Sequence, residues 1–196
     1  MKSAEFEKYM LAHDIHVFSI GEASKIIGKS KHYTSVFLSR NKNLMHAERG
    51  IYYLSGALEY EIASKLVFPS YVSLISALRF HNLTEQMPNI IYILSYKRHR
   101  SLKDLNGYGV EFRKIKREMM YGYAKFDNVF VAYPEKAVID MLYLGDFIEY
   151  AEELIESGKF DLKRLILYAK LAKNKSIINK INSMLEMNRI IAKAKM

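Results

Sequence analysis

Cysteine is absent from the 196-residue sequence. A chain without thiols has no disulfide scaffold, no thiol nucleophile and no cysteine-ligated zinc or iron–sulfur site. Long apolar runs are absent too: none approaches the roughly 20 residues that a membrane span requires. The polar start, residues 1–8, has no apolar core of a signal peptide. We therefore expect a soluble, cytoplasmic protein that does not enter a membrane.

The usual sequence signatures of catalysis are also missing. There is no phosphate-binding loop or dinucleotide-binding glycine motif, and His13 and His16 lack a third metal ligand nearby. Asp161-Leu162-Lys163 has the D-x-K spacing of some nucleases, but no acidic strand precedes it. Glu135 and Asp140 are five positions apart on one expected helix, so they point in different directions and form no acid–base pair. We expect no enzymatic activity, cofactor or metal, and we expect Asp140 to be buried with hydrogen-bond or ion-pair partners.

Positive charge is in excess and unevenly distributed. Half of the residues are apolar or aromatic and 26% are charged, with 30 Lys and Arg against 21 Asp and Glu. This composition is typical of a folded chain of one or two domains. Basic residues predominate in 1–56, 95–120 and 163–196, whereas acidic residues predominate in 146–162. The excess favours a polyanionic partner, although each basic run is also consistent with a solvated helix face.

Two short helices joined by a tight turn are predicted near the N-terminus. A capping-box pattern at 19–22 begins a helix over 20–27, and Gly28 is suited to end it. After a three-residue turn, Ser30 is placed to cap a second helix over 31–40. This spacing predicts a helix-turn-helix.

A hairpin is predicted directly after these helices, with strands at 44–46 and 51–54 around a turn. A helix over 4–13 and a short strand over 15–18 precede them. In this order the elements predict a winged helix-turn-helix domain over residues 1–56.

Residues 57–196 are predicted to form a mixed α+β domain followed by C-terminal helices. We expect Ser70 to cap a helix that runs through Val72 and Leu78. The other expected elements are helices over 57–66 and 134–144, strands over 89–96, 110–115, 121–123 and 129–132, and helices from 146 onward. The fold class is therefore α+β, with the boundary between domains near residue 56.

Several stretches resemble one known protein family. They are the segment 19–54 ending in Arg49-Gly50-Ile51-Tyr52-Tyr53, the run 69–78 with His81, the triplet Gln86-Met87-Pro88, and the run 129–140 from Val129 to Asp140. In this order they resemble the AbiEi-type antitoxins, which are predicted transcriptional regulators of viral defence systems, over about residues 5–145. Asn82 departs from the small residue, commonly glycine, that follows the equivalent of His81 in that family.

The resemblance implies a DNA-binding antitoxin that represses its own operon. In that operon such a protein is paired with a nucleotidyltransferase-like toxin, which it counteracts without necessarily binding it tightly. Some members of the family are stand-alone regulators, so the resemblance supports DNA binding more directly than it supports a partner toxin.

The residues expected to contact DNA lie on the second helix, in the turn before it and in the hairpin. We expect Tyr33, Val36, Phe37 and Leu44 to face inward and the opposite side of the helix to face a duplex. The expected DNA contacts are Lys29, Ser30, Lys31, His32, Thr34, Ser35, Ser39, His46 and Arg49.

Each group of contacts has its own chemistry. Lys31 and His32 carry donors for guanine acceptors, and the short hydroxyl side chains beside them suit bases or phosphates. Lys29 and the helix N-terminus suit a phosphate, because free N–H groups and the helix dipole favour an anion there. His46 and Arg49 of the hairpin are placed for phosphates or the minor groove. The same positions also fit a merely solvated helix face.

The remaining basic runs leave alternatives open. Lys97, Arg98 and Arg100 follow a predicted strand and either contact further phosphates or form a solvated turn. The amphipathic helices over 163–195 either join the core or form a homodimer, which would suit an operator of inverted repeats.

Two rival functions remain beside the repressor. The first is a protein–protein interaction module that binds an acidic partner without sequence-specific DNA binding, and the second is a nuclease or nucleotide-modifying enzyme. A shift assay with the upstream DNA separates the repressor from the interaction module, and metal-dependent cleavage would favour the nuclease.

Overall fold

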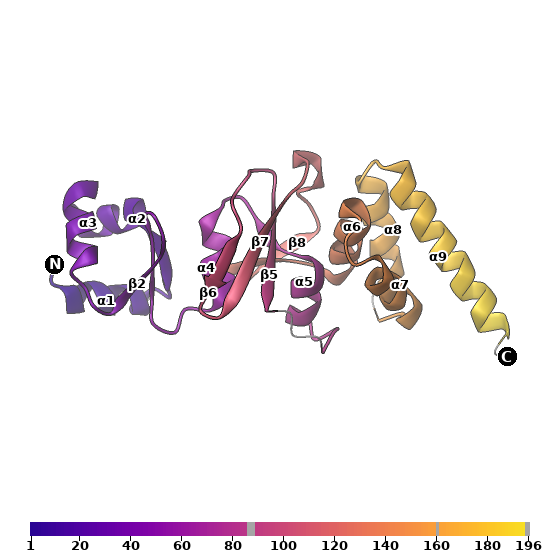
Figure 1. Ribbon diagram of the computed structural model, residues 1–196, viewed down its shortest axis with the longest axis horizontal. Helices are drawn as coiled ribbons and strands as arrows, with labels where there is room; N and C mark the ends of the chain where they lie inside the picture. Colours follow the sequence, from indigo (N-terminus) through magenta and orange to yellow (C-terminus); the bar gives the residue numbers. More distant parts are fainter. Residues whose placement is uncertain (86–88, 160, 195–196) are drawn as a thin grey trace.

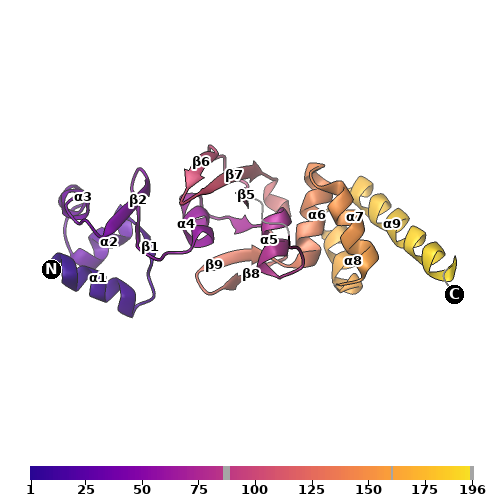
Figure 2. The same cartoon turned by 60° about the horizontal axis from the view of Figure 1, so that its bottom comes forward.

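The computed structural model describes residues 1–85, 89–159 and 161–194. It shows an elongated α+β molecule with the two chain ends at opposite ends of its long axis (Figure 1). Three helices and a small sheet form the N-terminal end, a six-stranded sheet lies in the middle, and a group of helices forms the C-terminal end (Figure 1 and Figure 2). No helix in the described ranges has both the length and the apolar content to cross a bilayer.

The N-terminal elements surround a small apolar core of their own. In chain order they are α1 (Ser3–Ala12), β1 (Val17–Ser19), α2 (Ile20–Ile27), α3 (Lys31–Ser39), β2 (Leu44–Glu48) and β3 (Ile51–Leu54). The strands form an antiparallel sheet in the order β1-β3-β2. The core between them consists of Phe6, Met10, Phe18, Ala23, Leu38 and Leu54.

Local capping signals set the bounds of α2 and α3. The Glu22 N–H donates to Ser19 Oγ at 3.2 Å, and the Ser19 N–H donates to Glu22 Oε2 at 2.7 Å, which completes the predicted capping box. Gly28 follows α2 with φ of +68°, a left-handed conformation that glycine adopts without a steric penalty. Ser30 Oγ accepts the Tyr33 N–H at 3.3 Å and caps α3. These predicted helix starts and the glycine stop are confirmed.

The middle of the molecule is a mixed six-stranded sheet in the order β6-β7-β5-β4-β9-β8. Within this sheet the adjacent strands β4 and β9, and also β5 and β7, are parallel, and the other adjacent pairs are antiparallel. The elements of this region are α4 (Glu59–Leu66), β4 (Tyr71–Val72), α5 (Leu74–Phe80), β5 (Ile90–Ser95), β6 (Leu102–Leu105), β7 (Tyr108–Lys114), the 3-10 helix η1 (Arg117–Met119), β8 (Tyr123–Phe126) and β9 (Val129–Ala132). Helix α4 contacts strands of both sheets and so lies between the two parts of the molecule.

The prediction that Ser70 caps a helix through Val72 was wrong. Tyr71 and Val72 form the short strand β4 between β5 and β9, and helix α5 begins only at Leu74. The cause is tertiary, because both residues of β4 are fully buried and their backbone pairs with strands distant in sequence. Ser70 Oγ instead donates to the carbonyl of Ser64 at 3.1 Å.

The C-terminal end consists of α6 (Pro134–Leu144), α7 (Ile148–Ser157), α8 (Leu162–Leu171) and α9 (Lys175–Ala194). Pro134 occupies the first turn of α6. Backbone N–H groups in this turn have no acceptor within the helix, so the proline, which lacks an N–H, costs no helical hydrogen bond. Asp161 Oδ1 accepts the backbone N–H groups of Lys163 and Arg164 at 2.8 and 3.2 Å, and so caps α8. The D-x-K spacing at 161–163 is thus explained by a helix cap.

A fully buried polar cluster joins helix α6 to the sheet. The Lys136 ammonium contacts Asp140 Oδ1 and donates to Tyr71 Oη at 2.9 Å. Asp140 Oδ2 accepts the hydroxyl groups of Tyr71 at 3.0 Å and Ser73 at 2.8 Å. The prediction that Asp140 is buried with hydrogen-bond and ion-pair partners is confirmed.

The segment 81–88 is only partly described. His81 Nε2 lies 2.8 Å from the carbonyl of Ala132 and ties the end of α5 to β9. Asn82 has φ of +55°, a left-handed conformation that asparagine adopts more readily than most residues other than glycine. Gln86-Met87-Pro88 lies outside the described residues.

Candidate nucleic-acid interface

Helix α3 lies at the surface of the N-terminal end of the molecule (Figure 1). Its inner side packs on α1 and α2 through Leu38, which is buried, and Phe37, whose ring meets the Phe6 ring edge-on at 5.7 Å between centroids. A hydrogen-bonded brace holds the loop after the helix, because Glu7 accepts the side-chain amides of Asn41 at 2.7 Å and Asn43 at 3.0 Å. These contacts hold the inner side of the helix against the N-terminal core, while its outer side faces solvent.

The predicted orientation of α3 was wrong in part. Thr34, expected to contact DNA, is fully buried, whereas Tyr33 and Val36, expected inside, are 51% and 38% exposed. Phe37 and Leu44 do pack against the N-terminal core as predicted. The helix turns Thr34, Phe37 and Leu38 inward at i, i+3, i+4 spacing, so the inner face is one residue out of phase with the prediction.

The other predicted contacts on and before α3 are accessible. Lys29, Lys31, His32 and Ser39 are exposed, and Ser35 is half-buried. Ser30 is exposed too, although its hydroxyl oxygen is engaged as the helix cap. The exposed face also includes Tyr33 and Arg40, which the sequence prediction left out of the contact set.

The chain segment that includes α3 carries only one sign of charge. Residues 23–47, from the middle of α2 to strand β2, contain five Lys or Arg and no Asp or Glu. The five are Lys25, Lys29, Lys31, Arg40 and Lys42. An uninterrupted basic segment around an exposed helix produces a positive potential that attracts a polyanion.

The hairpin β2–β3 lies beyond this segment. Arg49 is exposed in its turn, and His46 is exposed on β2 with its ring 4.9 Å from that of Tyr52. The strand β2 has a register shift between His46 and Glu48, which bends the hairpin near its tip.

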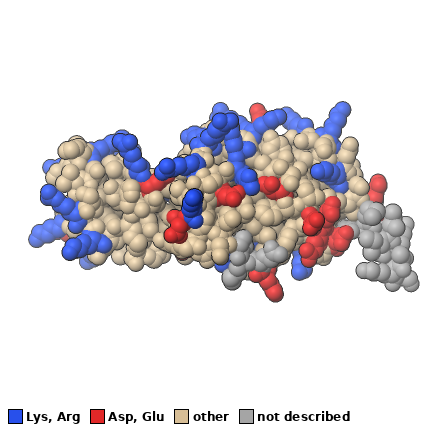
Figure 3. Space-filling view, in the orientation of Figure 1, with Lys and Arg blue, Asp and Glu red and all other residues tan. Residues whose placement is uncertain are grey.

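The structure brings the basic loop 97–100 beside this hairpin. His99 Nε2 lies 3.1 Å from Glu48 Oε1, so the loop is joined to β2 next to Arg49. Arg98 and Arg100 on either side of His99 are exposed. Lys97 is exposed as well, but its ammonium donates to the carbonyl of Phe68 at 2.6 Å, which makes it the least available of the three. Figure 3 shows Lys and Arg side chains along the upper edge of the molecule, over both its N-terminal end and its middle.

A second basic surface, which the sequence prediction did not resolve into residues, lies near the C-terminal helices. It is a groove of about 960 Å³ between the end of β7 and the α8–α9 connection. Its cations are Lys114, Lys116, Arg117, Lys173 and Lys175, and Glu118 is the single acidic residue that lines it. The sequence shows only that the runs 95–120 and 163–196 are both basic. It does not show that they lie together, because the two runs meet only in the folded molecule.

The described residues contain no cluster of three His, Asp or Glu side chains that could hold a metal ion. His13 stacks on Tyr9 at 4.0 Å between ring centroids, and His16 Nδ1 lies 3.5 Å from Glu61 Oε2. Glu135 is engaged elsewhere, since its carboxylate accepts the Asp161 N–H at 2.9 Å and lies 3.6 Å from Arg164. These residues have structural partners and do not converge on a common site.

Two comparisons with known proteins give no match for this chain. None of the models of known protein families matches the sequence, and the search among functionally curated proteins also gives no match.

Proposed function

We propose that the protein is a DNA-binding transcriptional repressor whose first 56 residues form a winged helix-turn-helix. The observation that carries the proposal is the exposed polar face of α3, which lies in a segment with five basic and no acidic residues. The order of elements supports it: α2 and α3 are separated by a three-residue turn and followed by a hairpin of the antiparallel sheet β1-β3-β2.

In this proposal α3 enters the major groove with its first turn toward the bases. Lys31 and His32 then offer donors to base acceptors, and Ser35 and Ser39 lie further along the same side. Lys29 and the N-terminal N–H groups of α3 take a phosphate, because the helix dipole is positive at that end.

The hairpin and the neighbouring loop extend the contact along the backbone. Arg49 and His46 reach phosphates or the minor groove, while Arg98 and Arg100 continue the positive surface beside them. Since His99 joins this loop to the hairpin through Glu48, the two segments approach the duplex as one body.

We further propose that the repressor is the antitoxin of an operon that also encodes a nucleotidyltransferase-like toxin. The support is the resemblance of 19–54, 69–81 and 129–140 to the AbiEi-type antitoxins. A homodimer would suit an operator of inverted repeats, and α8 offers a surface for one: it exposes the apolar side chains Leu162, Ile166, Leu167 and Leu171. Whether the antitoxin touches its toxin is a separate question that co-purification answers.

A shift assay with the DNA upstream of the gene tests the proposal. The protein is expected to prefer this duplex to a scrambled one, and its log affinity to fall linearly with log salt. Lys31→Ala is expected to weaken binding and to reduce the preference for the upstream duplex, because Lys31 is proposed to contact a base. Arg49→Ala, at a proposed phosphate contact, is expected to weaken binding and to reduce the magnitude of the salt slope by about 0.9, the value for one neutralised phosphate. Lys180→Ala, an exposed lysine of α9, is the matched control and leaves both quantities unchanged.

Two results would reject the proposal. Equal affinity for the upstream and scrambled duplexes would reject the repressor function, and unchanged affinity in both variants would show that Lys31 and Arg49 are not part of the interface.

A second function is favoured by the basic groove near α9. Its five cations have no ion pair among the described residues, so the groove suits an acidic protein segment. In that case the chain is an interaction module that captures an acidic partner without sequence-specific DNA binding. Charge reversal of Lys116 and Arg117 would then abolish capture of the partner, whereas Lys31→Ala would not affect it.

A further inference from the structure

The outward side of helix α3 carries an apolar side chain among polar ones. With Thr34 buried on the inner side, the helical repeat of about 3.6 residues places His32, Val36 and Ser39 in one row on the opposite side, at i, i+4, i+7 spacing. His32 and Ser39 are exposed, and Val36 is 38% exposed. Val36 therefore lies in the middle of the exposed row, between two polar side chains.

Val36 borders a surface hollow of about 190 Å³ between α3 and the start of α1. The other residues that line it are Ser3, Tyr33, Phe37, Arg40 and Asn41. The charged residue among these is Arg40, so this side of the helix is basic as well. The hollow leaves one side of Val36 open to a partner.

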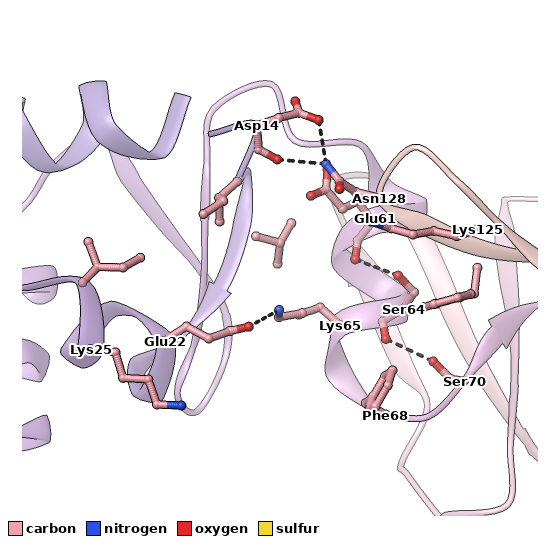
Figure 4. A pocket seen from close by; sticks show the side chains of 14 residues that line it. Asp14, Glu22, Lys25, Glu61, Ser64, Lys65, Phe68, Ser70, Lys125 and Asn128 are labelled. Carbon is pink, nitrogen blue, oxygen red and sulfur yellow. Dashed lines mark hydrogen bonds and ion pairs between the residues drawn. The ribbon is translucent and has the colours of Figure 1, made fainter. Parts of the chain in front are cut away.

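The contacts that join the N-terminal part to the sheet domain lie on other elements. Figure 4 shows Glu22 of α2 with Lys65 of α4, and Asp14 before β1 with Asn128 in the turn between β8 and β9. Glu22 Oε1 accepts the Lys65 ammonium at 2.7 Å, and Asp14 Oδ2 accepts the Asn128 amide at 3.1 Å. Neither contact involves α3, so the exposed row is available to a partner from outside the chain.

The charge around this row favours DNA as the partner. The segment 23–47 contains five basic and no acidic residues. An apolar side chain within a basic surface suits a partner that combines negative charge with small apolar groups. Duplex DNA has both, because its phosphates are anionic and the 5-methyl group of thymine projects into the major groove. Among the four bases only thymine has such a methyl group.

We infer that Val36 contacts the 5-methyl group of a thymine and is a specificity-determining residue of the proposed repressor. The methyl groups of Val36 and of the thymine exclude water from the space between them. His32 and Ser39, about one turn before and after, contact the base edges on either side. The inference rests on the proposed function and adds that the operator has an A·T pair beneath the middle of α3.

An exposed valine alone would need no explanation, because single apolar side chains are common on protein surfaces. The position of Val36 is what makes it informative, since the outward row of a helix in the major groove is the part that meets the base edges. Valine also has one strongly preferred rotamer in a helix. Little side-chain entropy is therefore lost when the contact forms.

The test removes the methyl groups of the DNA and keeps the base pairing. The probe is the duplex upstream of the gene, made with deoxyuridine in place of thymidine. The natural protein is expected to bind it about fourfold more weakly for each methyl group contacted, the factor for one methyl group buried from water. Duplexes with a single replacement then show which position α3 contacts.

Variants of Val36 identify the side chain. Val36→Ala is expected to bind the thymine duplex more weakly than the natural protein and to be insensitive to the deoxyuridine replacement. Val36→Ile keeps a branched apolar side chain and should retain the sensitivity. Leu11→Ala is the matched control: it shortens a 57% exposed side chain on α1 and should change neither the affinity nor the sensitivity.

The combination of both replacements separates a direct contact from an effect of DNA shape. Loss of the methyl groups also alters the stiffness of the duplex, but this change affects the natural protein and Val36→Ala alike. An equal loss in these two proteins, or no loss in the natural protein, would overturn the inference. Matching denaturation curves show that weaker binding does not come from unfolding.

The same assay keeps the inference apart from the proposed function. If the protein prefers its upstream duplex and the deoxyuridine replacement has no effect, the repressor stands and the role of Val36 is rejected. If the protein binds the upstream and scrambled duplexes equally, the repressor function itself is rejected, and recognition of an operator by Val36 is rejected with it.

Discussion

Replacement of Asp140 by asparagine tests directly how the buried polar cluster holds helix α6 on the six-stranded sheet. The substitution keeps the size of the side chain but removes the negative charge beside the Lys136 ammonium, and both residues are fully buried. Burial raises the pKa of Asp140 and lowers the pKa of Lys136, because each charged form loses its hydration; the contact between them opposes both shifts. In Asp140→Asn the cost of burying the Lys136 charge remains, whereas the attraction between the two charges is lost.

The expected loss is large because Lys136 has little else to compensate its charge. The Tyr71 hydroxyl oxygen accepts one N–H at 2.9 Å, and the Tyr71 and Tyr121 rings lie with their centroids 5.2 and 4.9 Å from Nζ. Breaking a buried ion pair from one side typically costs about 3–5 kcal/mol. For a chain of this size that corresponds to a fall in melting temperature of about 6–20 °C.

Urea denaturation of four proteins measures the effect: the natural chain, Asp140→Asn, Lys136→Met and the double variant. The double variant is expected to be more stable than Asp140→Asn alone, because no uncompensated ammonium is left in the core. Glu152→Gln, on the exposed side of α7, is the control and should change stability by less than about 0.5 kcal/mol. A loss below about 1 kcal/mol for Asp140→Asn, or a double variant with simply additive losses, would refute this account of the cluster.

Three further predictions concern single positions. Thr34→Val is expected to stabilise the protein by about 1 kcal/mol, because the buried Thr34 hydroxyl has no hydrogen-bond partner among the described residues. Its DNA affinity should be unchanged in the shift assay, and a clear loss would restore Thr34 as a contact. Gly122→Ala should destabilise more than Gly145→Ala in thermal denaturation: both have positive φ (+71° and +77°), but only at Gly122 would a Cβ meet side-chain atoms, at 3.0 Å; equal losses would contradict the steric argument. Burial alone would raise the pKa of Glu22, but its hydrogen bonds with Lys65 and Ser19 outweigh this and hold the pKa below its ordinary value of 4.5. A lowered pKa means stability that is present above pH 4.5 and lost as the pH falls further, so Glu22→Gln should lose less stability than the natural chain on acidification, and parallel pH curves would count against it.

Local signals in the sequence were sufficient for several helix bounds, although not for the start of α5. The Ser19 capping box, the Gly28 stop, the Ser30 cap and the proline at the start of α6 all satisfy or spare backbone groups within one turn of the helix. Such interactions involve residues at most four positions apart, so they can be recognised without any knowledge of the rest of the chain. The burial of Asp140 could be expected as well, although its partners Tyr71 and Ser73 could not.

The candidate interface was only partly predictable. The segment 29–49 is basic and polar in the sequence itself, and most of its predicted contacts are exposed. The side of α3 that faces inward was not predictable, because it depends on the Phe6 ring and on the Glu7 brace, both on α1. The loop 97–100 lies beside the hairpin only through Glu48 and His99, which are 51 positions apart.

The features that the sequence determined depend on local interactions, whereas those that the tertiary structure decided depend on contacts between segments far apart in the chain. Most helix ends and the sign of the charge were set by the sequence alone, because backbone groups at a helix end can be satisfied by residues nearby in the chain and charge can be counted without knowing the fold. The strand β4, the inner face of α3, the pairing of Lys136 with Tyr71 and the basic groove lined by Lys116 and Lys173 were decided only by the tertiary structure. Each requires segments far apart in the chain to exclude water from a shared surface, and only the closed fold specifies which segments meet.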